Sequence, residues 1–433
     1  MEKQALYDVN EVPPLQRWIP LSVQHVFAMF GATVLVPILT GLSPSLALLS
    51  SGAGTLLFIA ITRGQVPAYL GSSFAFIAPL QAVAAAYGEE WIGAALGGII
   101  TVGLLYAAVA AVVYMTGTGW IERIFPPVVI GSVIVVIGLG LARVGVDMAG
   151  LCAEPGCAKV AVSIADRDVQ ISLFTLVVTV AVAVFARGFA SVVPVLFGIA
   201  AGYAFAAALG AVDFTPVREA AWFGGPWRGP GWAAPRFDWT AISLIFPVGI
   251  VTIAEHLGDV FVLSRVVGRE FYKQPGLHRT LLGDGLASSL AGLLGGPPNT
   301  TYGENVGVLA ITRVYSVAVV ALAAVVAILL SFVPKLGALL QTIPAPVMGG
   351  IVMVLFGIIA SSGIRTLVES GIDFGHKRNL IIASVVLTLG IGGAQLSFGD
   401  FRIHGMAFAA LAGLLLNLVL PRERRGEEKG AAE

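Results

Sequence analysis

The stretch PPNTTYGENVGVLAITRV, residues 297–314, places two prolines, two glycines and a glutamate, Glu304, in a chain that otherwise carries little charge. Charged residues make up 12% of the 433 residues and hydrophobic residues 57%, whereas an ordinary soluble protein is about 25% charged. Stretches such as 126–150 and 316–334 are apolar and long enough to cross a bilayer core of roughly 30 Å. The sequence therefore predicts an all-α integral membrane protein rather than several soluble domains or a β-barrel.

The apolar stretches divide the chain into about fourteen expected membrane segments. They cover residues 18–40, 45–62, 66–82, 91–116, 126–149, 169–187, 190–210, 240–264, 279–295, 301–314, 316–333, 342–361, 379–395 and 404–420. The first 17 residues are polar and lead into a full-length segment, so we expect no cleavable signal peptide. Segments 66–82 and 301–314 are short for a complete crossing, and proline and glycine open both of them.

These two short segments are the third and the tenth, seven positions apart. Because seven is odd, the second half of the chain would run inverted relative to the first, as a 7+7 inverted repeat. Interrupted helices at matching positions of inverted repeats are typical of transporters and mark a binding site near the midplane. We therefore expect a short β-like stretch and a half-helix in each, although kinks in two packed helices are the simpler alternative.

Lysine and arginine residues give the expected orientation. They gather in 264–280, in 363–379 and in the tail after 420, all on the side of the termini, and the positive-inside rule assigns that side to the cytoplasm. The loop that carries Cys152 and Cys157 would then face outward, where a disulfide would persist; two free thiols are the alternative. The formal net charge of zero implies no nucleic-acid partner.

The polar residues inside the segments indicate what is bound. Each half-helix would turn free backbone N–H groups toward the centre, near Phe74 and near Gly303. The segment IVTIAEHLGDVFV adds Glu255 and Asp259, which share one helix face at i, i+4. Charged residues within a membrane are costly and therefore point to function. Glu255 and Glu304 between backbone donors would suit a planar ligand with N–H and C=O groups, and uracil fits well.

Carboxyl groups in such a pocket also predict coupling to protons. Two carboxylates one helical turn apart resist double ionisation in a poorly hydrated site, so Glu255 could carry a proton with Asp259 beside it. Asp259 could instead be a buried partner that holds a gate. His25 is a further candidate proton carrier, although a histidine that only packs is the simpler interpretation. His256 points about 100° away from Glu255 around the helix and is expected to be structural.

The remaining candidates have plain structural explanations. Asn305 is expected to tie backbone together at the break, and Arg313 to end the half-helix. Phe74 and Tyr302 could stack on a flat ring, but aromatic residues in membrane segments more often pack. The sequence contains no phosphate-binding Gly-Lys-Ser loop, no HExxH motif and no metal-spaced Cys/His set. We therefore expect no enzyme and no cofactor, with the proton as coupling ion.

The stretch GENVGVLAITR resembles the signature of the nucleobase–ascorbate transporter family, which runs as a polar residue, Asn, any residue, Gly, four residues, Thr and a basic residue. Glu304, Asn305, Gly307, Thr312 and Arg313 occupy those positions here. Four further stretches are similar to stretches of the bacterial uracil permeases within that family. They are SVQHVFAMFGATVLVP, PAYLGSSFAFI, IAEHLGD and QPGLHR. The likeness covers about residues 14–420.

The resemblance implies uracil:proton symport by a homodimer in the cell membrane. It implies a core domain made of 18–117 and 240–334 and a gate domain made of 125–210 and 340–420. It further implies that Glu255 and Glu304 bind the substrate. Amides at Phe74 and Gly303 would meet the base, and Ala32 and Tyr302 would line the pocket.

One residue departs from the family pattern. Asp259 stands where similar uracil permeases carry histidine and where purine-transporting relatives tend to carry aspartate. Glu304, in contrast, follows the uracil type, since purine carriers usually have glutamine there. The alternatives are therefore a xanthine or other purine symporter, an anion carrier or channel of related fold, which paired glutamates disfavour, and a membrane-embedded enzyme, for which no nucleophile–base pair is visible.

Overall fold

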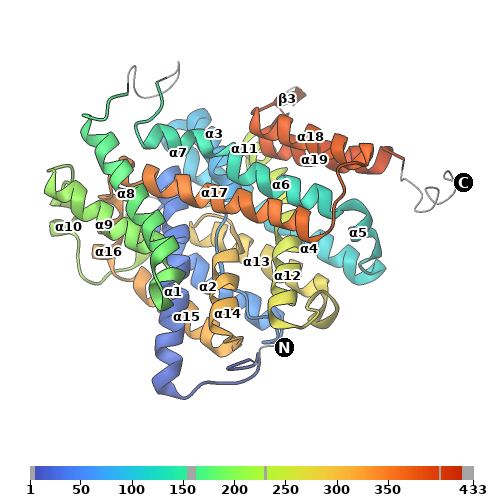
Figure 1. Ribbon diagram of the computed structural model, residues 1–433, viewed down its shortest axis with the longest axis horizontal. Coiled ribbons are helices and arrows are strands. Elements are labelled where there is room, and N and C mark those ends of the chain that lie inside the picture. The colour runs from blue at the N-terminus through green and yellow to red at the C-terminus, as the bar shows by residue number, and fades with distance from the viewer. Residues whose placement is uncertain (1–4, 154–161, 229–231, 399–400, 422–433) are drawn as a thin grey trace, which may run out of the picture.

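The computed structural model describes residues 5–153, 162–228, 232–398 and 401–421, and these are mostly helical (Figure 1). The first half contains α1 (Leu15–Thr40), α2 (Pro44–Ile61), β1 (Leu70–Ser72), the 3-10 turn η1 (Phe74–Phe76), α3 (Ile77–Tyr87), α4 (Trp91–Thr116), α5 (Gly119–Ile124), α6 (Pro127–Gly140), α7 (Ala142–Met148), α8 (Arg167–Phe185), α9 (Pro194–Ala208) and α10 (Thr215–Glu219).

The second half contains α11 (Trp239–Ile245), α12 (Val248–Val267), α13 (Leu277–Leu294), β2 (Asn299–Thr301), α14 (Gly303–Thr312), α15 (Val317–Ser331), α16 (Pro334–Gln341), α17 (Ala345–Glu369), α18 (Lys377–Ile391), β3 (Gln395–Phe398), β4 (Phe401–His404) and α19 (Gly405–Val419). The helices follow the predicted segments closely. The main differences are α16, which lies at 83° to α15, and α17, which continues well past residue 361.

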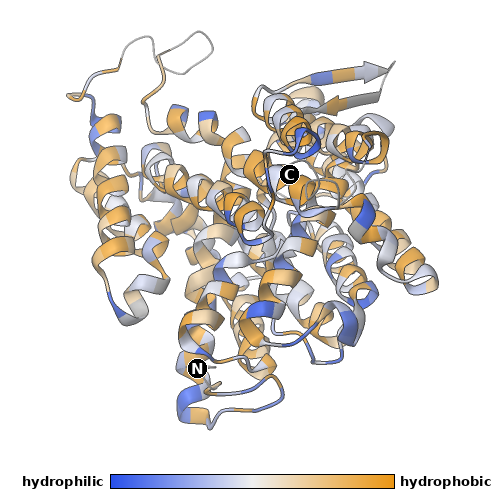
Figure 2. Cartoon of the chain, turned by 45° about the vertical axis from the view of Figure 1, so that its right-hand side comes forward, coloured by the Kyte–Doolittle hydropathy of each residue, from blue (hydrophilic) through white to orange (hydrophobic). Residues whose placement is uncertain are grey.

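Helix length supports a multi-pass membrane protein. Within the described ranges, seven helices are long and apolar enough to cross a membrane, or eight if α15 and α16 count as one bent span. The sequence predicted about fourteen crossings. Helices α9, α15, α18 and α19 have 15 residues each, which is about 22 Å at 1.5 Å per residue, shorter than a bilayer core of roughly 30 Å. The count of fourteen and the inverted repeat therefore stay predictions. Figure 2 shows hydrophobic residues along most helices and hydrophilic residues mainly in the connections.

The helices pack in two groups, each of which combines both halves of the sequence. In one group α13 packs on α2 and α4, and α15 packs on α1 and α2; in the other α17 packs on α6 and α8, and α18 packs on α6 and α19. Figure 1 shows α17 running across the molecule beside α6. Glycines permit the closest approaches, since a Cβ on Gly103 of α4 would lie 2.2 Å from the carbonyl of Gly285 on α13. Small residues at such interfaces are typical of membrane helices.

The predicted interruptions meet as two short strands. β1 and β2 pair antiparallel, with Leu70 opposite Thr301 and Ser72 opposite Asn299. Each strand then leads into a helix, β1 through η1 into α3 and β2 into α14. The pairing confirms that the two short segments combine a β-like entry with a half-helix.

Side chains of neighbouring helices satisfy the irregular backbone around these strands. The hydroxyl of Ser51 donates to the carbonyl of Leu70 at 2.6 Å, and the N–H of Leu70 donates to Thr55 Oγ1 at 3.0 Å. Ser288 Oγ bonds both backbone groups of Asn299 at 2.8 and 3.1 Å. Non-helical backbone at membrane depth persists only when it is buried in protein or lines a cavity, so these bonds from α2 and α13 allow the strands to exist.

Candidate functional site

Helix α12 passes beside the crossing strands and contacts η1, β2 and α14. It carries Glu255, while Glu304 lies in the first turn of α14. Both side chains are only partly buried. Glu255 Oε2 is buried without a hydrogen-bond partner in the part of the chain that the structure describes. Two glutamates from different helices are therefore available to a ligand at the strand crossing.

The two half-helices begin without a side-chain cap. The residue before η1 is Ser73 and the residue before α14 is Tyr302, and neither side chain bonds an N–H group of its helix. A Cβ added to Gly303 would meet no atom within 4 Å, and Gly303 is exposed. The first N–H groups of a helix have no partner inside that helix, so the start of α14 presents donors to open space.

Tyr302, the residue before α14, packs against β1 and α1. Tyr302 packs across Gly71, where a Cβ would lie 2.5 Å from the ring. Its hydroxyl donates to the carbonyl of Ser72 at 3.0 Å and accepts from Thr33 Oγ1 at 3.3 Å. The hydroxyl therefore braces β1 against α1, where Ala32 is buried as well.

Phe74 makes an aromatic contact with the second helix group. Its ring meets Phe356 of α17 edge to face, with centroids 5.9 Å apart and an interplanar angle of 85°. Nothing in the sequence singled out Phe356, since a phenylalanine in an apolar helix is ordinary. The contact brings α17 against the start of the first half-helix.

Asp259 is tied to the second strand. Its Oδ2 accepts a hydrogen bond of 2.8 Å from Thr301 Oγ1. The carboxyl group thus fixes β2 to α12. The bonded residue, Thr301, lies two residues before Gly303, where the half-helix that carries Glu304 begins. This arrangement is compatible with a holding role and with a role in proton transfer.

The signature residues hold α14 in place. Asn305 Nδ2 lies 3.0 Å from His25 Nδ1 and 3.2 Å from the carbonyl oxygen of His25, so Asn305 and His25 join α14 to α1. Thr312 donates to the carbonyl of Val308 at 2.8 Å, and Arg313 ends the helix in a left-handed conformation. Gly307, like Gly303, has no atom within 4 Å of an added Cβ.

A buried contact between a histidine and an aspartate carries no signal in the sequence pattern that singled out the other site residues. His256 Nδ1 lies 3.0 Å from Asp284 Oδ2, and both side chains are 0% exposed. The ring of Tyr106 meets His256 edge to face. His256 is thus turned into the protein interior. Asp284 on α13 by itself carried a usable signal, because it is an acidic residue within an expected membrane segment.

The site concentrates negative charge. Asp259 follows Glu255 one turn along α12, Glu304 lies in the first turn of α14, which contacts α12, and Asp284 lies beside His256, the neighbour of Glu255. Like charges gathered in one place disfavour one another. A cluster of acidic residues of this kind disfavours an anionic ligand.

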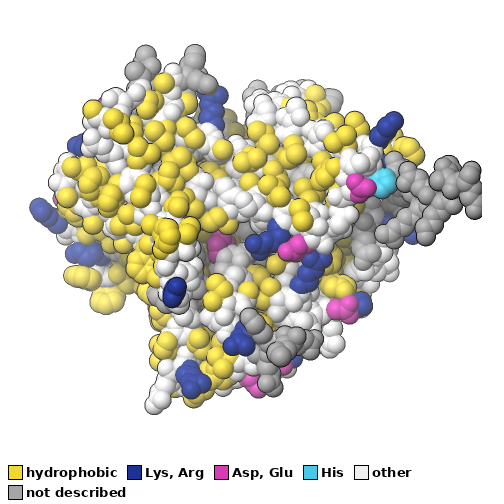
Figure 3. Space-filling view, in the orientation of Figure 1, with side chains coloured by type: hydrophobic (Ala, Val, Ile, Leu, Met, Phe, Trp, Pro, Cys, Tyr) yellow, Lys and Arg dark blue, Asp and Glu magenta, His cyan; other side chains and the backbone are white. Residues whose placement is uncertain are grey.

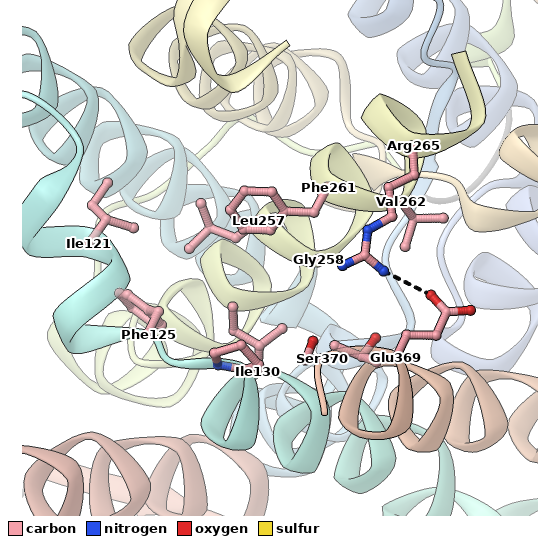
Figure 4. Close-up of a pocket in the computed structure, with 12 residues that line it drawn as sticks. Ile121, Phe125, Ile130, Leu257, Gly258, Phe261, Val262, Arg265, Glu369 and Ser370 are labelled. Atoms are coloured by element: carbon pink, nitrogen blue, oxygen red, sulfur yellow. Dashed lines mark hydrogen bonds and ion pairs between the residues drawn. The ribbon is translucent and has the colours of Figure 1, made fainter. Parts of the chain in front are cut away.

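A cavity lies between α12, which carries Glu255, and helices α6 and α17 of the second helix group. Its volume is about 440 Å³, and it is lined by α5, α6, α12 and the end of α17 (Figure 4). Gly258, Val262 and Arg265 of α12 line it and follow Glu255 at i+3, i+7 and i+10. Arg265 Nη1 bonds Glu369 Oε2 of α17 at 3.0 Å across the cavity. Figure 3 shows one face of the whole molecule. Charged side chains are sparse over its upper part and more frequent toward its middle and lower part.

The cysteine prediction falls partly outside the described residues. Cys152 lies within them and is largely buried, whereas Cys157 lies outside them. The proposed pair and the side of the membrane that it faces stay predictions.

Known proteins resemble this chain over almost its whole length. A model of the Permease family matches residues 16–398. A uracil permease of Bacillus caldolyticus is 52% identical over 435 residues, which cover 99% of this chain and 97% of that protein. A uracil permease of Bacillus subtilis (strain 168) is 49% identical over 431 residues, which cover 98% and 97%. The transmembrane domain of a cyanobacterium bicarbonate transporter, BicA, aligns with TM-score 0.63 and 16% identity over 94% of this chain and 99% of that one, a likeness of fold alone.

Proposed function

The chain belongs to the Permease family, and on that premise we propose that it imports uracil into the cell by proton symport. The relatives named above are permeases, so this protein is a multi-pass membrane transporter and not an enzyme. Uracil, for which these relatives are named, belongs to the ligand class suggested by the residues at the strand crossing.

The observation that carries the proposal is the unpartnered buried Oε2 of Glu255 beside the uncapped start of α14 at Gly303. Uracil has two ring N–H groups and two carbonyl groups in one plane. Glu255 and Glu304 would accept the N–H groups, and the amides at Gly303 and Phe74 would donate to the carbonyl oxygens. Hydrogen bonds to charged groups are about twice as strong as neutral ones, so an ionised Glu304 would supply most of the selectivity for a base.

The proton enters with the substrate because the pocket carries too many carboxyl groups to stay fully ionised. We assign the co-transported proton to Glu255, with Asp259 one turn away on α12. Asp259 would favour the protonated state of Glu255 while its bond to Thr301 keeps it in position. His25, bonded to Asn305, is the alternative carrier. No other cofactor is needed.

The proposed architecture is fourteen spans in a 7+7 inverted repeat, with both termini in the cytoplasm. Residues 18–117 and 240–334 would form the core domain, and 125–210 and 340–420 the gate domain. The two packing groups of helices agree with this division, since each combines both halves of the chain. Motion of one group against the other would open the cavity crossed by Arg265 and Glu369. A homodimer would give the gate domains a fixed support.

A purine substrate is the second candidate, because Asp259 follows the purine type at its position.

Purified protein in proteoliposomes should take up labelled uracil along an inward proton gradient, and an excess of unlabelled uracil should compete. Xanthine and bicarbonate should compete poorly. Uptake of xanthine in preference to uracil would transfer the assignment to purines, and competition by bicarbonate alone would favour an anion carrier.

A further inference from the structure

The segment before α1 is bonded to the connection that follows α14. The N–H of Leu6 donates to the carbonyl of Arg313 at 2.9 Å, the N–H of Tyr315 donates to Tyr7 at 2.8 Å, and the N–H of Val317 donates to Val9 at 3.0 Å. Ser316 Oγ donates to the carbonyl of Glu11 at 2.5 Å. Residues 6–11, here called the strap, thus lie alongside 313–317 like an added strand.

The strap is also anchored in a small apolar core. Val9 is 1% exposed and belongs to a cluster with Val306 and Leu309 of α14 and Val260 and Leu263 of α12. Four members of this cluster thus come from the two helices that carry the glutamates, and others come from α2, β1 and α13. Burial of Val9 in the cluster removes apolar surface that its members would otherwise expose.

An ion pair extends the strap to the end of α12. Asp8 Oδ2 lies 2.6 Å from Arg269 Nη2, directly after the glycine that ends α12. Both side chains are nearly half exposed, so the pair alone contributes little stability. Its geometry nevertheless fixes which end of α12 the strap reaches.

We propose that the strap is a positioning element of the substrate site, which sets the separation of Glu255 and Glu304 by holding α12 and α14 together at their C-terminal ends. The inference rests on the proposed function, since it concerns how the two glutamates meet one ligand. Helix α14 has only ten residues and emerges from a three-residue strand. Its far end therefore needs an external support, and the strap supplies one from the opposite end of the sequence.

The test compares Val9→Asp with Val12→Asp in the full-length protein. Both variants place a carboxylate near the start of the chain, but Val9 is 1% exposed and Val12 is 61% exposed. We expect uracil to bind Val9→Asp about tenfold more weakly, because a misplacement of about 1 Å can cost up to about 10² in a preorganised site. Val12→Asp should bind like the wild type. Equal affinity in the two variants would overturn the proposal.

Hydrogen exchange without uracil separates the strap from the substrate assignment. The amides of Tyr315 and Val317 should exchange faster in Val9→Asp than in Val12→Asp. Faster exchange with unchanged uracil affinity would show a strap that is structural only, which contradicts a positioning role. If the wild type fails to bind uracil, the proposed function fails, whereas unchanged exchange in Val9→Asp would refute the strap itself.

A charge reversal covers the case in which Val9→Asp does not fold. Asp8→Arg should weaken uracil binding because it faces Arg269 with a second cation. The double variant Asp8→Arg/Arg269→Asp should restore the affinity, as it restores an ion pair. Weak binding in both single and double variants, with wild-type thermal stability, would contradict the link between the strap and α12.

Discussion

The hydroxyl group of Thr301 donates a hydrogen bond of 2.8 Å to Oδ2 of Asp259, which joins strand β2 to helix α12 beside Glu255. This bond holds an acidic side chain within one helical turn of the proposed proton carrier. It makes Asp259 the residue at which a structural role and a role in proton coupling are best separated.

Replacing Asp259 by Asn keeps an acceptor for Thr301 and removes the charge. Uracil should still bind, but the pH range in which it binds should extend less far toward alkaline pH. The reason is that a neighbouring negative charge favours the protonated form of Glu255. Titration of uracil binding against pH measures the shift, and accumulation against a gradient should be impaired. Thr301→Val, which removes the bond and keeps the charge, is the matched control. Wild-type pH dependence and full accumulation in Asp259→Asn would leave Asp259 a structural role.

Replacing Glu304 by Gln should weaken uracil binding roughly ten- to hundredfold, because hydrogen bonds to charged groups contribute about 1.5–3 kcal/mol. The glutamine keeps the size and one carbonyl acceptor, so the loss reports the charge. Isothermal calorimetry on purified protein gives the dissociation constant. Glu89→Gln, on an exposed residue far along the chain, should bind like the wild type. An unchanged constant in Glu304→Gln would remove Glu304 from the site.

Replacing Asp284 by Asn should destabilise the protein by about 1–3 kcal/mol, since it disturbs the buried contact between Asp284 and His256. Thermal unfolding of Asp284→Asn in detergent should show a clear fall in melting temperature, whereas the exposed Asp213→Asn should not. The double variant His256→Leu/Asp284→Leu should recover part of the loss, because an apolar pair needs no compensating charge. A single variant as stable as the wild type would show that the pair contributes nothing.

Cys152 and Cys157 should react from outside the cell. The distribution of Lys and Arg, by the positive-inside rule, predicts that their loop lies on the extracytoplasmic face. A membrane-impermeant thiol reagent, applied to intact cells after reduction, should label both cysteines. Labelling that appears only after the cells are permeabilised would reverse the proposed orientation.

Much of the site could be predicted because its residues break the rules of a membrane segment. Glu255, Asp259 and Glu304 are charges in an apolar chain, and the prolines and glycines at 66–73 and 295–303 interrupt helices where β1 and β2 form. Such residues can be recognised from the sequence alone, because each departs from the apolar pattern of its own segment. Asp284 is the same kind of violation and was overlooked.

Other features depend on tertiary contacts that leave no local signal. Phe356 is a phenylalanine in an apolar helix, so the sequence does not single it out. Its contact with Phe74 is seen only in the folded structure. The strap looks like a polar leader, yet Val9 is buried against residues some 250 to 300 positions away. Helix α16 was missed because it is short and begins at Pro334, directly after a sharp bend that follows α15.

The central claim is that uracil and a proton enter together through the pocket of Glu255 and Glu304. Proteoliposomes that contain a pH-sensitive dye, with equal pH on both sides and free counter-ion movement, test it most directly. Added uracil should acidify the interior with the wild-type protein, and Glu304→Gln should require much more uracil for the same rate. Uptake of labelled uracil without acidification would contradict the account.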